Sequence, residues 1–360
     1  MDLQNFIDQN KVNYLELFKK ENLYVRKYSK NGLALIKAKR DKEYNYEEHP
    51  WMRYCRGAII DINMDRVVCV PPLKAYYEPD LIKILNEINE GDKKVFQPLI
   101  EGTMVNMFYH NDEWIISTRS NIGAKNSWDG KIPFHHMFKE IMGTEWFEEL
   151  DKECCYSFVL RHKKNRIVVP VEENAIYLVE CYRINGDGIH PEILPEIDGI
   201  VSNFDMNEYG LESYNDYLPY TIKGFTMKQG NFRLNWINPT YLYVKRLKMN
   251  NNHTFLNYIE LRQKRLLVEY LNYFPEDQYQ FNEYKVNYNK IKDQLYEEYV
   301  SIFIRKTKKM KDTNYSLKPL LYELHEYYKT TKNKINMKIV SDYMHQLPSK
   351  KMLFIYNYFY

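Results

Sequence analysis

The chain has 360 residues, of which 44% are apolar and 16% aromatic, which is enough for two domains with substantial cores. No run approaches the ~18 to 20 uninterrupted apolar residues of a membrane span. The start MDLQNFIDQN also lacks the basic and then apolar order of a signal peptide. We therefore expect a folded, soluble, cytoplasmic protein with no membrane association.

Up to about residue 250, short β-branched and aromatic runs alternate with turn-forming residues, a rhythm that predicts antiparallel sheet. The main runs are GAIIDI (57–62), RVVCV (66–70), MVNMFYH (104–110), EWIISTR (113–119), RIVVPV (166–171), AIYLVECYRI (175–184) and GFTMKQ (224–229). Helices are predicted beside the sheet at residues 2 to 20, 79 to 90, 134 to 142 and 206 to 217.

After residue 250 the apolar spacing changes to three and four, which predicts helices. The Asn-rich segment KMNNNHT marks the junction, and its Asn or Thr side chains can cap the incoming helix. We therefore predict an α+β protein, with a mainly antiparallel domain over residues 1–248 and an all-helical domain over residues 249–360.

Charge is distributed unevenly along the chain. The net charge of +3 conceals twelve Lys/Arg against four Asp/Glu between residues 300 and 360. This basic end is a candidate phosphate-contacting surface, although a solvated helical face is the more common meaning of a lysine run.

Five cysteines are present, without CxxC pairs or Cys/His ligand spacing, namely Cys55, Cys69, Cys154, Cys155 and Cys181. We expect reduced, mostly buried thiols, with neither a disulfide framework nor a zinc site.

The stretch QPLIEGTMVNMFYHNDEWIISTRSNIG, residues 97 to 123, has the layout of a nucleotide-charging site except at one position. Enzymes that attach a nucleoside monophosphate to themselves use a lysine amine in the order Lys-x-Asp/Glu-Gly. Here the four positions are Leu99, Ile100, Glu101 and Gly102. A leucine side chain has no lone pair and cannot form a phosphoramide, so the nucleophile is missing.

Four further segments flank this stretch, namely YCRGAIIDINMDRVVCVPPLKAYYEPD, CYSFVLRHKKNRIVVP, IKGFTMKQGNFRLNWINPTYLYVKRLK and YIELRQKRLLVEYLNYFPEDQYQF. In order and spacing they resemble RNA ligases of the bacteriophage T4 RNA ligase 1 type. That family belongs to the covalent nucleotidyltransferases, which include DNA ligases and mRNA capping enzymes. The resemblance covers roughly residues 30 to 290. It implies that residues 1–248 form a ligase-like nucleotidyltransferase domain.

The resemblance also locates further losses. Val159 and Lys223 stand where the family has glutamates, and Arg233 and Asn235 stand where it has paired lysines. Those carboxylates would manage magnesium and the ribose. We therefore predict a pseudoenzyme with no catalytic residue, no metal site and no cofactor. Three lysines keep a noncanonical RNA ligase or guanylyltransferase as an alternative, namely Lys125, Lys163 and Lys228.

The resemblance implies that cations remain near the phosphates of a bound nucleotide, namely Arg56, Arg119, Arg161 and Lys245. Arg56 is favoured among them, because an Arg-Gly pair ahead of a strand lets side chain and backbone approach an anion together. The bland alternative for Arg119 is an ion pair with a neighbouring carboxylate.

Base recognition has its own candidates. The resemblance implies that Phe158 stacks on the base, and Glu101 can accept from a base or ribose edge. Both also have structural alternatives, as a core aromatic and as a residue that orients the turn. A methylated cap is cationic and attracts aromatic faces, for which Trp236 is the candidate, with Glu101 or Glu180 as the acid. Other tryptophans near these segments are Trp51, Trp114 and Trp128.

The sequence therefore predicts a catalytically inactive RNA-ligase-like protein that binds RNA, at a 5′ end or mRNA cap, through the former nucleotide pocket. The competing interpretation is a structural or regulatory subunit whose surface docks a protein partner.

Overall fold

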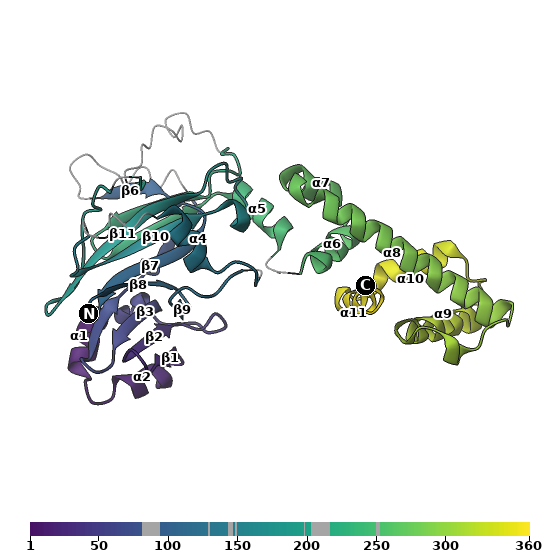
Figure 1. Cartoon of the computed structure of the whole chain (residues 1–360), viewed down its shortest axis with the longest axis horizontal. Helices are drawn as coiled ribbons and strands as arrows, with labels where there is room; N and C mark the ends of the chain where they lie inside the picture. The colour runs from purple at the N-terminus through teal and green to yellow at the C-terminus, as the bar shows by residue number, and fades with distance from the viewer. Residues whose placement is uncertain are drawn as a thin grey trace. The chain divides into compact units, whose positions relative to one another are not determined.

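The computed structural model describes residues 1–80, 94–128, 130–142, 147, 150–197, 199–202, 217–249 and 253–360. The chain divides into two compact units, a first unit Met1–Leu242 and a second unit Tyr243–Tyr360 (Figure 1). The first unit combines helices with three sheets and the second is helical, which confirms an α+β protein with mainly antiparallel sheets and a helical C-terminal part. The helix α5 (Pro239–Lys248) spans the division between the units. Within the described ranges, no helix is both long and apolar enough to cross a membrane.

The first sheet has four antiparallel strands in the order β1-β2-β3-β4. These are β1 (Tyr24–Tyr28), β2 (Leu33–Lys37), β3 (Arg56–Asp61) and β4 (Arg66–Cys69). Two helices, α1 (Leu3–Gln9) and α2 (Tyr14–Lys20), share its core, in which the rings of Phe6 and Trp51 stack 4.0 Å apart. The single helix predicted over residues 2 to 20 is therefore wrong, because Asn10 ends the first helix. The Asn10 side chain donates to Phe6 O at 2.8 Å and so competes with the helical pattern.

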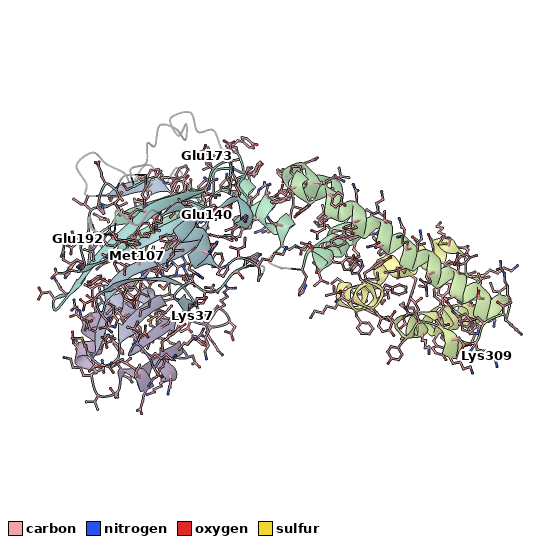
Figure 2. The ribbon with its side chains drawn as sticks, in the orientation of Figure 1. Lys37, Met107, Glu140, Glu173, Glu192 and Lys309 are labelled. Atoms are coloured by element: carbon pink, nitrogen blue, oxygen red, sulfur yellow. The ribbon has the colours of Figure 1, made fainter. Side chains whose placement is uncertain are left out.

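The second sheet has six antiparallel strands in the order β12-β11-β10-β7-β8-β9. Their bounds are β7 (Thr103–His110), β8 (Glu113–Thr118), β9 (Asn121–Ile122), β10 (Cys154–Arg161), β11 (Ala175–Asn185) and β12 (Gly188–Pro191). The helix α4 (Phe134–Ile141), which confirms the helix predicted at 134 to 142, shares a core with β7, β10 and β11. Met107 lies in the middle of β7 and is fully buried (Figure 2).

The strand predicted over RIVVPV, residues 166–171, is wrong, since this segment is irregular, with bends at residues 167–169. Val168 and Val169 donate their N–H groups to the Glu101 carboxylate, and the Arg166 guanidinium folds back onto Val168 O at 2.9 Å. The N–H groups of Val168 and Val169 and the carbonyl of Val168 are thus already hydrogen-bonded and are not available for pairing with a strand.

The third sheet has the order β5-β14-β13-β6, in which β5 pairs with β14 in parallel and the other pairs are antiparallel. Its strands are β5 (Tyr76–Tyr77), β6 (Val95–Pro98), β13 (Gly224–Gln229) and β14 (Phe232–Ile237). The helices predicted at 79 to 90 and 206 to 217 fall largely outside the described residues. All five cysteines are buried, as expected.

The second unit packs helices around an aromatic core, in which Phe255 stacks on Tyr356 with ring centroids 3.9 Å apart. Its helices are α6 (Thr254–Gln263), α7 (Leu267–Tyr273), α8 (Gln278–Tyr299), α9 (Lys318–Thr331), α10 (Met337–Gln346) and α11 (Ser349–Phe359). The long helix α8 continues into a π-helical turn, Val300–Ile304.

Candidate functional site

The nucleophile position lies directly after β6. Leu99 donates its backbone N–H to Gly224 O at 2.8 Å, which continues the pairing of β6 with β13. The Lys223 ammonium donates to Ile100 O at 3.1 Å. An aliphatic side chain therefore occupies a position that the backbone fixes firmly on the third sheet.

Glu101 is buried and acts as a backbone acceptor. Its Oε1 accepts the N–H groups of Val168 at 3.0 Å and Val169 at 2.8 Å. Burial, and then the adjacent Glu101 carboxylate, raise the pKa of the Tyr241 hydroxyl. In this arrangement Glu101 ties the 168–169 segment to the start of β7, which corresponds to the orienting role rather than to contact with a base.

Phe158 lies in the core of the second sheet with 0% of its surface exposed. Its ring packs edge-on against Phe138 of α4 at 5.6 Å and is tilted against Tyr156 at 6.4 Å. As placed here, Phe158 offers no face to a base, and the stacking role implied by the family resemblance is not available to it.

The tryptophan expected at the pocket is also buried. Trp236 stacks on Phe225 at 6.1 Å, and its Nε1 donates to Pro79 O at 3.0 Å. Trp51 belongs to the core of the first sheet, whereas Trp128 is exposed. Neither buried indole is positioned to sandwich a methylated base.

Two of the predicted cations have surroundings of their own. Arg161 donates to Pro170 O at 2.9 Å, and its guanidinium lies 5.9 Å from the centre of the Tyr177 ring. Lys245 lies on α5 and belongs to the second unit.

Arg56 and Arg119, in contrast, are brought together by a close approach of β3 to the end of β8. A Cβ atom on Gly57 would lie 2.6 Å from Arg119 Cα, so only glycine permits this approach. The pair Arg56-Gly57 thus serves strand packing in addition to presenting a cation. The Arg56 guanidinium donates to Leu73 O at 3.1 Å, which holds it beside the segment leading to β5.

A group of four cations results, Arg56, Lys74, Arg119 and Arg233, which we call the cation cluster. Burial lowers the pKa of Arg56, and the charge of Arg233 lowers it further. Burial, together with Arg56 and Arg119, lowers the pKa of Lys74. Desolvation by the surrounding protein, followed by the charges of Arg56 and Arg233, lowers the pKa of Arg119 to about 9. The charge of Arg56 thus acts on Lys74 and Arg119, and the charge of Arg233 acts on Arg56 and Arg119.

Arg119 has unused hydrogen-bonding capacity within this cluster. Although the surrounding protein desolvates its charged group, part of the residue's surface stays exposed, and its guanidinium makes no hydrogen bond or ion pair with any residue in the described ranges. The predicted alternative, an ion pair with a neighbouring carboxylate, is not seen among those residues. A guanidinium carries five donors in a planar fork that matches phosphate.

Behind the cluster lies a charge triad with unequal numbers of cations and anions. Glu180 Oε2 accepts from Arg233 and from Lys228, the latter at 3.0 Å, and Lys228 also donates to Val179 O at 2.7 Å. Burial is the main cause that lowers the pKa of Lys228 to about 8, and Arg233 adds to it. One carboxylate facing two cations leaves an excess of positive charge in a largely buried place.

An exposed aromatic ring borders the cluster. Tyr77 on β5 is 59% exposed, and the Lys74 ammonium lies 5.8 Å from its ring centre. Sequence reasoning did not select Lys74, Tyr77 or Arg233 as site residues. The signal was present, because the first two lie in LKAYYEPD and the third stands at a family lysine position.

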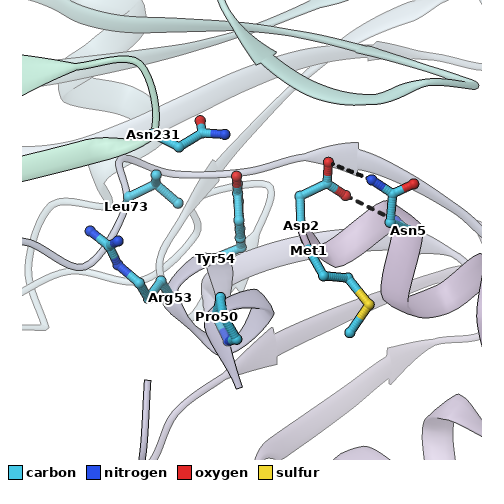
Figure 3. A pocket seen from close by; sticks show the side chains of 8 residues that line it. All are labelled: Met1, Asp2, Asn5, Pro50, Arg53, Tyr54, Leu73 and Asn231. Atoms are coloured by element: carbon cyan, nitrogen blue, oxygen red, sulfur yellow. Dashed lines mark hydrogen bonds between the residues drawn. The ribbon is translucent and has the colours of Figure 1, made fainter. Parts of the chain in front are cut away.

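A separate pocket lies near the N-terminus of the first unit (Figure 3). It is lined by Met1, Asp2, Asn5, Pro50, Arg53, Tyr54, Leu73 and Asn231. The lining includes none of the binding residues predicted from the sequence. Its Asp2 carboxylate caps α1 by accepting from Asn5, and its Arg53 donates to Lys74 O at 2.9 Å. Arg53 therefore fixes the backbone of a cluster residue.

No protein-family model matches the chain, and no curated protein matches it. Among solved structures, the chain is similar to a putative ATP-dependent DNA ligase from Aquifex aeolicus. The identity is 14% and the TM-score 0.40, over 82% of this chain and 77% of that one. It is also similar to an archaeal ATP-dependent RNA ligase, with 12% identity and a TM-score of 0.43, over 76% of this chain and 75% of that one. The ligase-like character of the chain is what the sequence motifs imply.

Proposed function

We propose that the first unit binds the phosphorylated 5′ end of RNA through the cation cluster and transfers no nucleotidyl group. The observation that carries this proposal is the Arg119 guanidinium, which lies beside Arg56 and has no hydrogen-bond acceptor among the described residues. Cations that lower one another's pKa repel each other, and an anion placed among them relieves this repulsion. A terminal phosphate supplies both the charge and the acceptors that a guanidinium fork requires.

The absence of transfer rests on Leu99, because no amine occupies the position from which a family lysine attacks. The amine of Lys228 has a lowered pKa, as a nucleophilic lysine requires. However, Lys228 is largely buried and is already bonded to Glu180 and to Val179 O. It therefore supports the charge balance of the site rather than an attack on phosphorus.

The phosphates are the part of the RNA end that the site recognises. A methylated cap would need aromatic faces and a carboxylate that can accept from the base. Trp236 is buried and Glu180 is already paired with two cations, so neither supports that role. Tyr77 is the exposed ring at the cluster, and we assign to it the stacking on the terminal base.

The test is a titration of the full chain with short RNAs that carry a methylated cap, a triphosphate or a hydroxyl at the 5′ end, at two salt concentrations. We expect the triphosphate to bind more tightly than the hydroxyl. Arg119→Gln should remove about 10- to 100-fold of this preference, since hydrogen bonds to charged groups contribute ~1.5–3 kcal/mol. Arg161→Gln is the matched control, because Arg161 lies on β10 outside the cation cluster.

Equal affinity of the wild-type protein for all three ends would refute end binding and would leave the protein-docking alternative standing. A loss of preference in Arg161→Gln as large as that in Arg119→Gln would refute the assignment of the site. A preference for the cap over the triphosphate would show that the methylated base is read as well.

A further inference from the structure

Two tyrosines of the second unit expose their rings to solvent. Tyr315 is 66% exposed in the 3-10 turn Tyr315–Leu317, and Tyr322 is 59% exposed on α9. Within the described ranges, neither ring contacts another ring and neither hydroxyl has a hydrogen-bond partner. The faces of both rings are therefore available to a ligand.

The two tyrosines lie along the same side of this segment as three lysines, Lys311, Lys318 and Lys329. α9 buries Leu320, Leu321 and Leu324, which lie on one side of the helix. Residues four and seven apart share a face, so Lys318, Tyr322 and Lys329 lie together, away from the buried leucines.

The 3-10 turn extends this line before α9 begins. Tyr315 precedes Lys318 by one 3-10 turn, and the Lys318 ammonium reaches back to Lys311 O at 3.2 Å. We call Lys311, Tyr315, Lys318, Tyr322 and Lys329 the Tyr–Lys stripe.

The charge around the stripe is mainly positive. Among the described residues, none of its lysines forms an ion pair with a carboxylate. The neighbouring Glu323 is already held by Lys351 at 2.8 Å and by the Tyr343 hydroxyl. Two exposed carboxylates also lie nearby, Asp312 and Glu326, the latter on the same face of α9 as Tyr322.

More exposed cations precede the stripe in the chain, namely Arg305, Lys306 and Lys309, the last of which is labelled in Figure 2. The carboxylate of Glu298 precedes these cations in the chain. It accepts hydrogen bonds from the Lys308 ammonium at 2.5 Å and from the Thr313 hydroxyl at 3.1 Å. The excess of positive charge therefore continues ahead of the stripe.

We propose that the Tyr–Lys stripe binds single-stranded RNA, with the tyrosine rings stacking on bases and the ammonium groups contacting phosphates. Aromatic faces interleaved with unpaired cations suit a strand whose bases are unstacked and accessible. A duplex keeps its bases inside its own stack and would present only phosphates to these lysines. The stripe lies in the second unit, so the proposal does not depend on recognition of the 5′ end by the first.

The experiment measures binding of the full chain to a short single-stranded RNA with a 5′ hydroxyl, and to the same sequence as a blunt duplex. The hydroxyl end removes the phosphate that the first unit would recognise, so the failure of one proposal is distinguishable from the failure of the other. We expect Tyr315→Ala and Tyr322→Ala each to weaken single-strand binding by about 5-fold or more, as for the loss of one stacked base.

Three variants separate the parts of this explanation. Tyr322→Phe keeps the ring and should bind as the wild-type protein does. Lys329→Gln should reduce the slope of log affinity against log salt by about 0.7, the value for one phosphate contact on a single strand. Tyr279→Ala is the matched control, because Tyr279 is 83% exposed on α8, outside the Tyr–Lys stripe. It should leave the affinity unchanged.

Wild-type affinity in both tyrosine-to-alanine variants would overturn the proposal. Equal losses in Tyr279→Ala, or duplex binding as tight as single-strand binding, would also overturn it. All three tyrosines are exposed, so circular dichroism and thermal midpoints should match the wild type. If the stripe variants lose binding only to anionic lipid vesicles, the occupant is a membrane surface and the RNA proposal falls.

Discussion

Replacement of Gly57 by alanine tests how β3 and β8 bring Arg56 and Arg119 together. Gly57 has φ +113°, and an added Cβ would lie 2.6 Å from Arg119 Cα and 2.9 Å from Arg119 O. Both are backbone atoms, so one strand must move. Overpacking costs ~1–3 kcal/mol, and a left-handed backbone adds ~1–2 kcal/mol once a Cβ is present. We expect Gly57→Ala to lower the free energy of unfolding by about 2–5 kcal/mol.

Gly230→Ala is the matched control, because Gly230 also has a positive φ, +52°, but an added Cβ there meets open space. It should cost only the backbone term, ~1–2 kcal/mol. Denaturant unfolding followed by tryptophan fluorescence is a suitable assay, since all five tryptophans precede residue 242 and report on the first unit. The reasoning is refuted if Gly57→Ala is no more destabilising than Gly230→Ala. Gly57→Ala should also lose the preference for a 5′ triphosphate, because Arg119 is displaced.

Three further predictions concern chemistry, burial and pH. Leu99→Lys, incubated with ATP or GTP and a divalent metal, should gain no covalent nucleotide, because Val159 and Lys223 replace the glutamates of the family. A protein mass increased by AMP or GMP would contradict this prediction. Glu101→Ala should lower the free energy of unfolding by about 2–5 kcal/mol, since it removes the acceptor of two buried N–H groups. Glu101→Gln keeps an acceptor oxygen and should cost less. Equal stability of Glu101→Ala and the wild-type protein would favour a ligand-binding role for Glu101 instead. The pKa of the Tyr241 hydroxyl is raised in the folded protein, so the unfolded chain loses this proton first. The free energy of unfolding should therefore fall as pH rises above ~10, by up to ~1.4 kcal/mol per pH unit. Tyr241→Phe should flatten this pH dependence, and an unchanged slope in that variant would contradict the assignment to Tyr241.

The sequence predicted the strands well where one face of a strand is apolar and turns flank it, as at residues 104–110 and 113–119. It failed at RIVVPV, which has strand composition but donates backbone N–H groups to a carboxylate 67 residues earlier. It also joined α1 and α2, because the apolar spacing continues past Asn10 while the side chain of Asn10 ends the helix locally. Long-range and side-chain competition of this kind leaves no periodic signal.

The candidate site was predictable in its chemistry more than in its geometry. The missing amine at Leu99 can be read directly, since the surrounding motif fixes its position. The burial of Phe158 could not be read, because seven of the eight residues of β10 are buried and alternation then distinguishes no pocket face. The meeting of Arg56 with Arg119 depends on a backbone approach at Gly57 between distant strands, which no local pattern encodes.

The unequal triad of Glu180 with Lys228 and Arg233 gives the proposed anion site a thermodynamic consequence that the melting temperature would report. An anion that settles beside the surplus charge binds the folded chain and not the unfolded one, and adds about 2.7 kcal/mol of stability at a hundredfold excess over its dissociation constant. Phosphate, pyrophosphate, triphosphate and nucleotides can thus be ranked by thermal shift without labelled RNA. Arg119→Gln supplies the baseline for such a screen, because it should remove the shift for every compound that uses this site and leave the shifts of all others in place.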